Sequence, residues 1–127
     1  MSDQTGASSI QFDKVGDAAV ARPQMKMMDD QSLKTLVRMI EELSPESAVG
    51  GVIIDLSRVT ILPSLALGLL VQISNTCKAR EQKLTLAGLQ PQIRKVFTIT
   101  RLDRVFQIAD SVEAAMKSAV RGGSEPS

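Results

Sequence analysis

Hydrophobic residues along the chain form two alternating patterns, short continuous runs and repeats spaced by three or four positions. The run VIIDL at 52–56 is rich in β-branched residues and does not alternate with polar ones, which is typical of a central strand covered on both faces. Further strands are predicted at 10–15, 18–21, 83–89 and 105–108. The first two of these would form a hairpin around Gly16-Asp17.

The spaced repeats predict helices between the strands. We expect Asp29 or Asp30 to cap the first helix and Ser44-Pro45 to end it. A second, strongly apolar helix begins at about Ser64, and a third opens at Pro91, since proline suits the first turn of a helix. The first helix carries the repeat Leu33, Leu36, Val37, Ile40 and Leu43, and the third carries Ile93, Val96 and Phe97.

A final helix is predicted from its start signal as well as from its repeat. Asp110 and Glu113 stand three residues apart, the spacing of a capping box in which two side chains satisfy the first free amides of a helix. The apolar repeat that follows consists of Val112, Ala115, Met116 and Ala119.

Strands that alternate with helices predict an α/β domain with a central, mixed but largely parallel sheet. The pattern gives four to five strands and about four helices packed on them. With 127 residues, of which 43% are apolar, the chain has the size and the core material of one domain. We assign this domain to residues 9–120, and expect the polar, small-residue ends 1–8 and 121–127 to be disordered.

Composition argues against most kinds of chemistry. The chain has no histidine and one cysteine, so the commonest general base is missing and neither a metal site nor a cofactor is expected. A nucleophile at Ser57 or Ser64 would have only Asp55 and Arg58 nearby in sequence, and neither suits the role of its base. The glycines do not have P-loop spacing, and three phenylalanines without tyrosine or tryptophan offer little for stacking nucleic-acid bases. An enzyme and a nucleic-acid partner are therefore not expected.

The same composition indicates a protein of the reducing cytoplasm. A single cysteine, Cys77, cannot form an internal disulfide, and its position in a helical repeat suits a small buried hydrophobe. The first residues, MSDQTGASS, lack the apolar core of a signal peptide. The most apolar window, Leu62 to Ile73, is too short to span a bilayer, so no transmembrane segment is predicted.

Charge is balanced overall, with a formal net charge of +1, but unevenly distributed. The segment 76–108 holds seven basic residues against Glu81 and Asp103. Two interpretations stay open, an acidic partner or an ordinary solvated surface. The basic residues are Lys78, Arg80, Lys83, Arg94, Lys95, Arg101 and Arg104.

The helix that begins near Ser64 is more apolar than a solvated helix needs to be. A helical wheel places Ala66, Leu69, Leu70, Ile73 and Cys77 on the side toward the sheet, and Gly68, Gln72, Asn75 and Lys78 opposite. Leu65 at the rim, with Leu67 and Val71 on the far flank, lies outside the core stripe. Either other parts of the domain or a partner protein must cover these three side chains.

The segment VIIDLSRVTILPSLALGLLVQI resembles the centre of the STAS domain, the fold of bacterial anti-sigma-factor antagonists. In that family a strand ending in DLS leads to a DSSGLG-like motif at a helix start. Asp55-Leu56-Ser57 and Val59 match, and aligning Leu67-Gly68 with the motif places Pro63 at its aspartate, Ser64 and Leu65 at its two serines and Ala66 at its glycine. The later segment LAGLQPQIRKVFTITRLDRVFQIADSVEAAM resembles the second half of the family.

The resemblance implies a protein that docks an anti-sigma factor, a serine-kinase-like partner, and is released when the second serine of the motif is phosphorylated. Here that position is Leu65, which has no hydroxyl, so the usual switch is lost unless Ser64 or Thr60 takes the phosphoryl group. Either hydroxyl could instead cap the helix. Our hypothesis is constitutive docking by apolar contact through Thr60–Val71. The candidate partner-binding residues are Asp55, Ser57, Thr60, Leu62, Pro63, Ser64, Leu65, Leu67, Gly68 and Val71.

A second implication of the resemblance stays open. STAS-like domains also serve as structural subunits, attached to lipid-trafficking ABC transporters or assembled into stress-signalling scaffolds, and a corner that cannot be phosphorylated suits such standing contacts. The sequence does not decide between these roles, and it leaves formation of a homodimer open.

Overall fold

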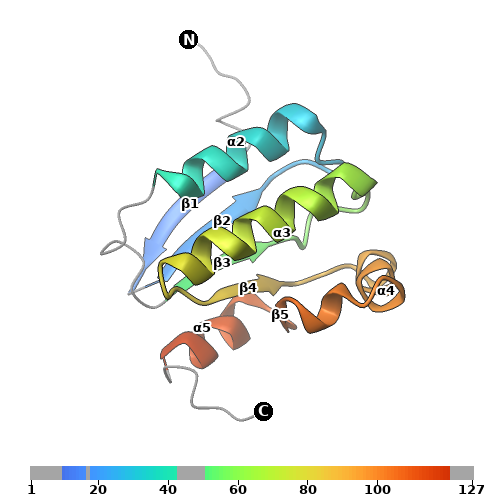
Figure 1. The fold of residues 1–127 in the computed structure, drawn as a ribbon. Helices are drawn as coiled ribbons and strands as arrows, with labels where there is room; N and C mark the ends of the chain where they lie inside the picture. Colours follow the sequence, from blue (N-terminus) through green and yellow to red (C-terminus); the bar gives the residue numbers. More distant parts are fainter. Residues whose placement is uncertain (1–9, 17, 43–50, 121–127) are drawn as a thin grey trace.

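The computed structural model describes residues 10–16, 18–42 and 51–120. In this part of the chain strands and helices alternate after an initial hairpin, as predicted (Figure 1). The predicted tails at 1–8 and 121–127, the hairpin residue Asp17 and the first helix's Leu43 and Ser44-Pro45 lie outside the described residues.

The sheet has five strands in the order β1-β2-β3-β4-β5. The hairpin strands β1 and β2 are antiparallel, and the remaining neighbours are parallel, which confirms the predicted mixed, largely parallel sheet. In parallel strands joined by helices, the carboxyl ends of the strands and the starts of the helices meet at one end of the molecule. The strands are β1 (Ile10–Val15), β2 (Ala18–Pro23), β3 (Gly51–Asp55), β4 (Leu84–Ala87) and β5 (Gln107–Ala109).

Helices cover both faces of the sheet. Figure 1 shows α2 and α3 side by side on one face and α5 on the other, with α4 beyond the end of β4. No helix in the described part of the chain has the length and apolar character that crossing a membrane would require. The helices are α2 (Asp30–Glu41), α3 (Ser64–Ala79), α4 (Pro91–Ile99) and α5 (Val112–Val120), with the short 3-10 turn η2 (Leu102–Arg104) after α4.

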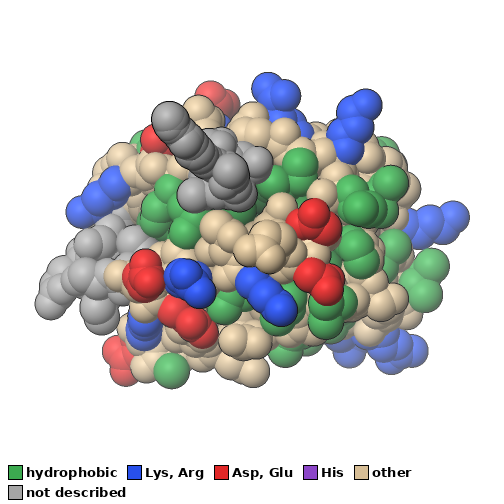
Figure 2. All heavy atoms as spheres, turned by 90° about the horizontal axis from the view of Figure 1, so that it is seen from above, with side chains coloured by type: hydrophobic (Ala, Val, Ile, Leu, Met, Phe, Trp, Pro, Cys, Tyr) green, Lys and Arg blue, Asp and Glu red, His purple; other side chains and the backbone are tan. Residues whose placement is uncertain are grey.

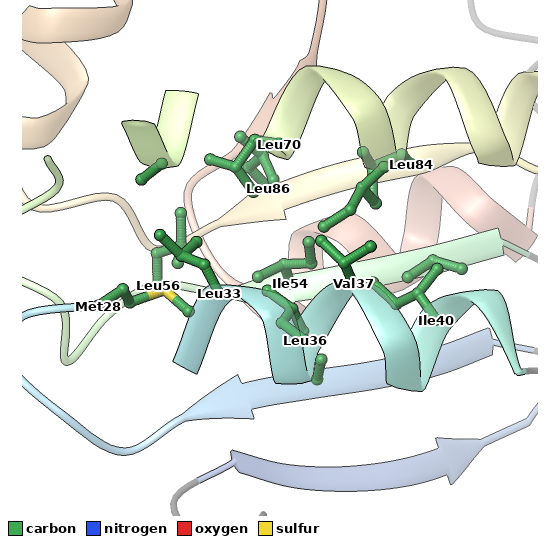
Figure 3. Close-up of a cluster of buried hydrophobic side chains, with 14 of the residues drawn as sticks. Met28, Leu33, Leu36, Val37, Ile40, Ile54, Leu56, Leu70, Leu84 and Leu86 are labelled. Carbon is green, nitrogen blue, oxygen red and sulfur yellow. The ribbon is translucent and has the colours of Figure 1, made fainter. Parts of the chain in front are cut away.

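The larger core lies between the sheet and the α2–α3 layer (Figure 3). Alternate residues of β3 point to opposite faces, so Val52 and Ile54 enter this core while Ile53 packs toward α5. Because both faces are covered, the first four residues of β3 are all buried. This explains the absence of hydrophobic alternation in the central run of the sequence.

Two helix starts show how local sequence fixes the ends of elements. Asp29 caps α2 by accepting a hydrogen bond of 2.9 Å from the backbone N–H of Ser32, and this bond holds the pKa of the Asp29 carboxyl below its usual range. At α5 the predicted capping box was wrong. Ser111 lies one residue later and its Oγ accepts from the backbone N–H of Ala114 at 3.1 Å, while Asp110 pairs with Arg94.

The last strand begins two residues later than predicted, at Gln107 instead of Val105. The preceding residues form η2, so Val105 lies in a turn. Phe106 is buried and packs edge-to-face against Phe97, with ring centroids 5.6 Å apart. This contact with α4 anchors the chain just before it enters the sheet.

Candidate functional site

Two loops meet at the end of the sheet where α2 and α3 begin. The carbonyl oxygen of Lys26, between β2 and α2, accepts hydrogen bonds from the backbone N–H groups of Thr60 at 2.8 Å and Ile61 at 3.0 Å. The Thr60 hydroxyl donates to the same oxygen at 3.4 Å. Met27 and Ile61 also form an isolated parallel β-bridge, so the two loops are joined through their backbones.

The joined loops and the first turn of α3 expose three large hydrophobic side chains. Met27 is 47% exposed, Ile61 54% and Leu65 49%, and we call this set the apolar corner. In Figure 2 hydrophobic side chains gather toward the right, the end at which α2 and α3 begin. Each of these side chains would gain free energy by leaving water, on the order of 1 kcal/mol for a half-exposed residue. The corner is therefore suited to contact with another apolar surface.

The flank of α3 is covered inside the domain to different degrees. Leu62, Leu67 and Val71 are partly buried and pack against the larger core, so for these residues internal cover accounts for much of their apolar character. Leu65 protrudes beyond that packing. Among the predicted site residues on α3, Ser64 and Gly68 are also exposed.

Neither candidate hydroxyl caps α3. Pro63 is the N-cap residue and supplies no side-chain hydrogen bond, and Ser64 is the first residue of the helix itself. Thr60 is half-buried and its hydroxyl is engaged with Lys26. The capping interpretation was thus wrong for both residues, because proline at the cap places Ser64 one position too late.

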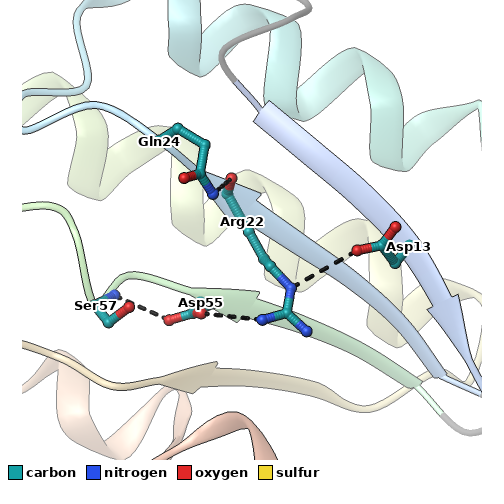
Figure 4. A network of polar contacts seen from close by, with 5 residues as sticks. All are labelled: Asp13, Arg22, Gln24, Asp55 and Ser57. Carbon is teal, nitrogen blue, oxygen red and sulfur yellow. Dashed lines mark hydrogen bonds and ion pairs between the residues drawn. The ribbon is translucent and has the colours of Figure 1, made fainter.

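Asp55 and Ser57 belong to a polar network on the α5 face of the sheet (Figure 4). One oxygen of Asp55 accepts from the Ser57 backbone N–H at 3.0 Å, and the other lies 3.6 Å from Nη1 of Arg22. Nε of Arg22 lies 3.8 Å from the carboxylate of Asp13. The Asp55 side chain is mostly buried and is engaged in these internal contacts.

The described residues offer little for catalysis or metal binding. They contain no group of three or more potential metal-ligating side chains. Cys77 is buried in the larger core, and burial raises the pKa of its thiol to about 11, against the weaker opposing effect of the Arg80 charge. A thiol with such a pKa is a poor nucleophile at neutral pH.

Met27 is the corner residue that the pattern of apolar repeats did not identify. It lies in a loop, where no periodicity predicts exposure, and it meets Ile61 only through the fold. One sequence signal was present, since three methionines occur in the six residues 23–28. Methionines outside a helix or strand repeat are typical of adaptable binding surfaces.

Comparison with known proteins identifies the family. The STAS domain model matches residues 9–115. The chain belongs to the STAS domain family. It is also 30% identical over 57 residues to a STAS-domain containing protein of Pseudomonas aeruginosa, an alignment that spans 45% of this chain and 56% of that relative. The matched part is thus little more than half the length of the curated relative.

Solved STAS structures share the fold of the whole described domain. A candidate anti-sigma factor antagonist of Thermotoga maritima matches with a TM-score of 0.79 at 19% identity, covering 91% of this chain and 98% of that one. The phosphorylated Bacillus cell fate determinant SpoIIAA matches at 0.66 and 22% identity, covering 85% and 97%. A chain of the stressosome, described as a signal integration and transduction hub, matches with a TM-score of 0.69 at 19% identity, covering 91% of this chain and 100% of that one. These likenesses confirm the STAS-like fold.

Proposed function

We propose that this STAS protein is a non-catalytic regulator that docks an anti-sigma factor or a related serine-kinase-like protein through the apolar corner. The observation that carries the proposal is the half-exposed Leu65 at the start of α3, four residues after Ile61, which forms a β-bridge with the equally exposed Met27. The resemblance gives this corner the docking role in the family. Leucine in place of the motif's second serine makes the contact apolar and removes the hydroxyl that would carry a phosphate.

The loss of the switch has a physical consequence. A phosphoryl group adds about −1.5 to −2 charges, which an apolar contact cannot accommodate. Leu65 cannot acquire that charge, so docking at the corner would persist until the partner is removed by other means. Ser64 is exposed beside it, and phosphorylation there would restore a switch one residue away.

Structural assembly is the second candidate function, because one solved relative of the same fold belongs to the stressosome. A permanent apolar corner is equally suited to standing contacts in such a scaffold, or to a subunit of a lipid-trafficking ABC transporter. The two functions differ in the kind of complex that the protein forms. A regulator exchanges between a small kinase-like partner and a free pool, whereas a scaffold subunit stays in a large complex.

The test is affinity purification of the tagged chain from its native cells, with mass spectrometry of both the partners and the intact bait. A small kinase-like partner supports the regulator, and transporter subunits or a large assembly support the second candidate. Binding of the recovered partner is then measured for Leu65→Asp and for Val15→Asp, an exposed hydrophobic residue on strand β1. Loss of affinity in the first variant alone is expected. Equal affinity of both variants would contradict docking at the corner.

A further inference from the structure

The structure divides the basic stretch at 76–108 into cations with internal partners and cations without them. Arg80 donates to the backbone carbonyls of Ile40 and Glu41, at 3.1 and 2.6 Å, and Arg94 pairs with Asp110 at 3.3 Å. Lys95, Arg101 and Arg104 are exposed and form no ion pair with a described residue. These three lie within ten residues of one another, on α4 and the turn that follows it.

Two exposed aliphatic side chains lie between or directly after these three cations in the sequence. Ile99 is 71% exposed, more than any other large hydrophobic residue described, and Val105 is 40% exposed. Lys95 precedes Ile99 by one helical turn and therefore lies on the same side of α4. Arg101 to Val105 follow directly in a compact turn closed by backbone hydrogen bonds. We call the set of Lys95, Ile99, Arg101, Arg104 and Val105 the α4 patch.

Arg101 occupies a position whose backbone conformation favours glycine. It adopts the left-handed conformation, φ 65° and ψ 17°, immediately after the Thr100 cap of α4. Glycine reaches this conformation without strain, whereas a residue with a Cβ does so at a cost. Within the described part of the domain, the Arg101 guanidinium forms no hydrogen bond or ion pair that would compensate for this cost. Backbone strain of this kind persists where other interactions maintain it, and it recurs at ligand-binding sites.

We infer that the α4 patch is a second docking surface, for an acidic segment of a protein partner that places an apolar side chain on Ile99 and carboxylates on Arg101 and Arg104. Arginine matches carboxylate geometry through paired N–H donors. Two aliphatic side chains are too few to anchor the patch in a bilayer. The inference does not depend on the function proposed for the apolar corner.

The test uses the full chain and three probes, namely a random copolymer of glutamate and tyrosine, double-stranded DNA, and phosphatidylcholine vesicles containing phosphatidylserine. The patch variant is Arg101→Glu with Arg104→Glu. The control is Lys34→Glu with Lys78→Glu, an equal change of charge at exposed positions on α2 and α3. We expect the native chain to prefer the copolymer, and its affinity to fall about tenfold or more in the patch variant and less than about twofold in the control.

A second pair of variants separates binding from folding. Arg101→Gly and Glu81→Gly both place glycine at a left-handed position, φ 65° and φ 59°, so neither should lower the unfolding midpoint. Only Arg101→Gly removes a patch cation, and only it should weaken copolymer binding. Absence of copolymer binding by the native chain, equal losses in patch and control variants, or a preference for DNA or vesicles would each overturn the inference.

Discussion

Met27 and Ile61, 34 positions apart in the sequence, lie side by side as an isolated parallel β-bridge and each exposes about half of its side chain. The proposed docking surface is therefore formed by two loops, of which only one carries the family motif. If the corner binds a partner as proposed, we expect the β2–α2 loop to contribute to the contact.

The first prediction follows from that pairing. Met27→Asp should weaken binding of the partner recovered at the corner about tenfold, roughly 1.4 kcal/mol, because a charged group would be buried without a counter-ion. The fold should be retained, since the side chain is half-exposed. Titration calorimetry with Val15→Asp as control measures the effect. Unchanged affinity in Met27→Asp together with a loss in Leu65→Asp would confine the site to the β3–α3 loop.

Two glycines are predicted to respond in opposite ways to alanine. At Gly51, with φ 116°, a Cβ would lie 2.6 Å from the backbone carbonyl oxygen of Lys83 in the approach to the neighbouring strand. We expect Gly51→Ala to destabilise the domain by about 3 kcal/mol or more. Gly68 occupies an exposed position of α3, where an added Cβ would meet nothing within 4 Å. Gly68→Ala should therefore stabilise the domain by about 0.5–1 kcal/mol. Urea unfolding of both variants decides the signs.

Asp55 is predicted to act on stability. Asp55→Ala removes the acceptor of the Ser57 amide and the counter-charge of Arg22, at a cost of about 1–3 kcal/mol. Asp55→Asn keeps an oxygen for the Ser57 amide and should recover part of that loss. Chemical unfolding gives the stabilities, and affinity for the partner gives the second readout. If an Asp55 variant lost affinity for the partner but kept full stability, Asp55 would belong to the partner-binding surface and not only to the internal network.

Stability should also depend on alkaline pH through Cys77. The folded-state pKa, about 11, lies above the ordinary value of 9.0, so the folded chain holds this proton more tightly than the unfolded chain does. The contribution is present below pH 9 and is lost as pH rises from 9 to 11, by roughly 2 kcal/mol. To isolate the contribution of the thiol, the pH dependence of the free energy of unfolding is compared between the native chain and Cys77→Ala. Identical slopes in the two chains would show that the thiol is not the cause.

Most of the fold follows from local pattern, because each element carries its own signal. The run at 52–56 requires cover on both faces, and the structure provides it from α2 and α3 on one side and α5 on the other. Pro91 and Asp29 fix helix starts through backbone chemistry confined to a few residues. The start of β5 was less predictable, since the Phe97–Phe106 contact that determines it joins two separate elements.

The candidate site was only partly predictable for the same reason. The exposure of Leu65 follows from its angle on the helical wheel, but the exposure of Met27 depends on a bridge between distant loops. Asp55 looked like a surface residue of the motif. Its ion pair with Arg22, which also faces Asp13, becomes visible only when three neighbouring strands are aligned in the sheet.

One carbonyl oxygen, that of Lys26, receives the amides of Thr60 and Ile61 and the Thr60 hydroxyl. These hydrogen bonds couple the two loops, so a displacement of one loop is transmitted to the other. A partner that pulls on the β3–α3 loop would therefore strain the entry into α2 as well. Changes in loop length at either place should be tolerated only in matched pairs, so the two loops would be expected to vary together among relatives.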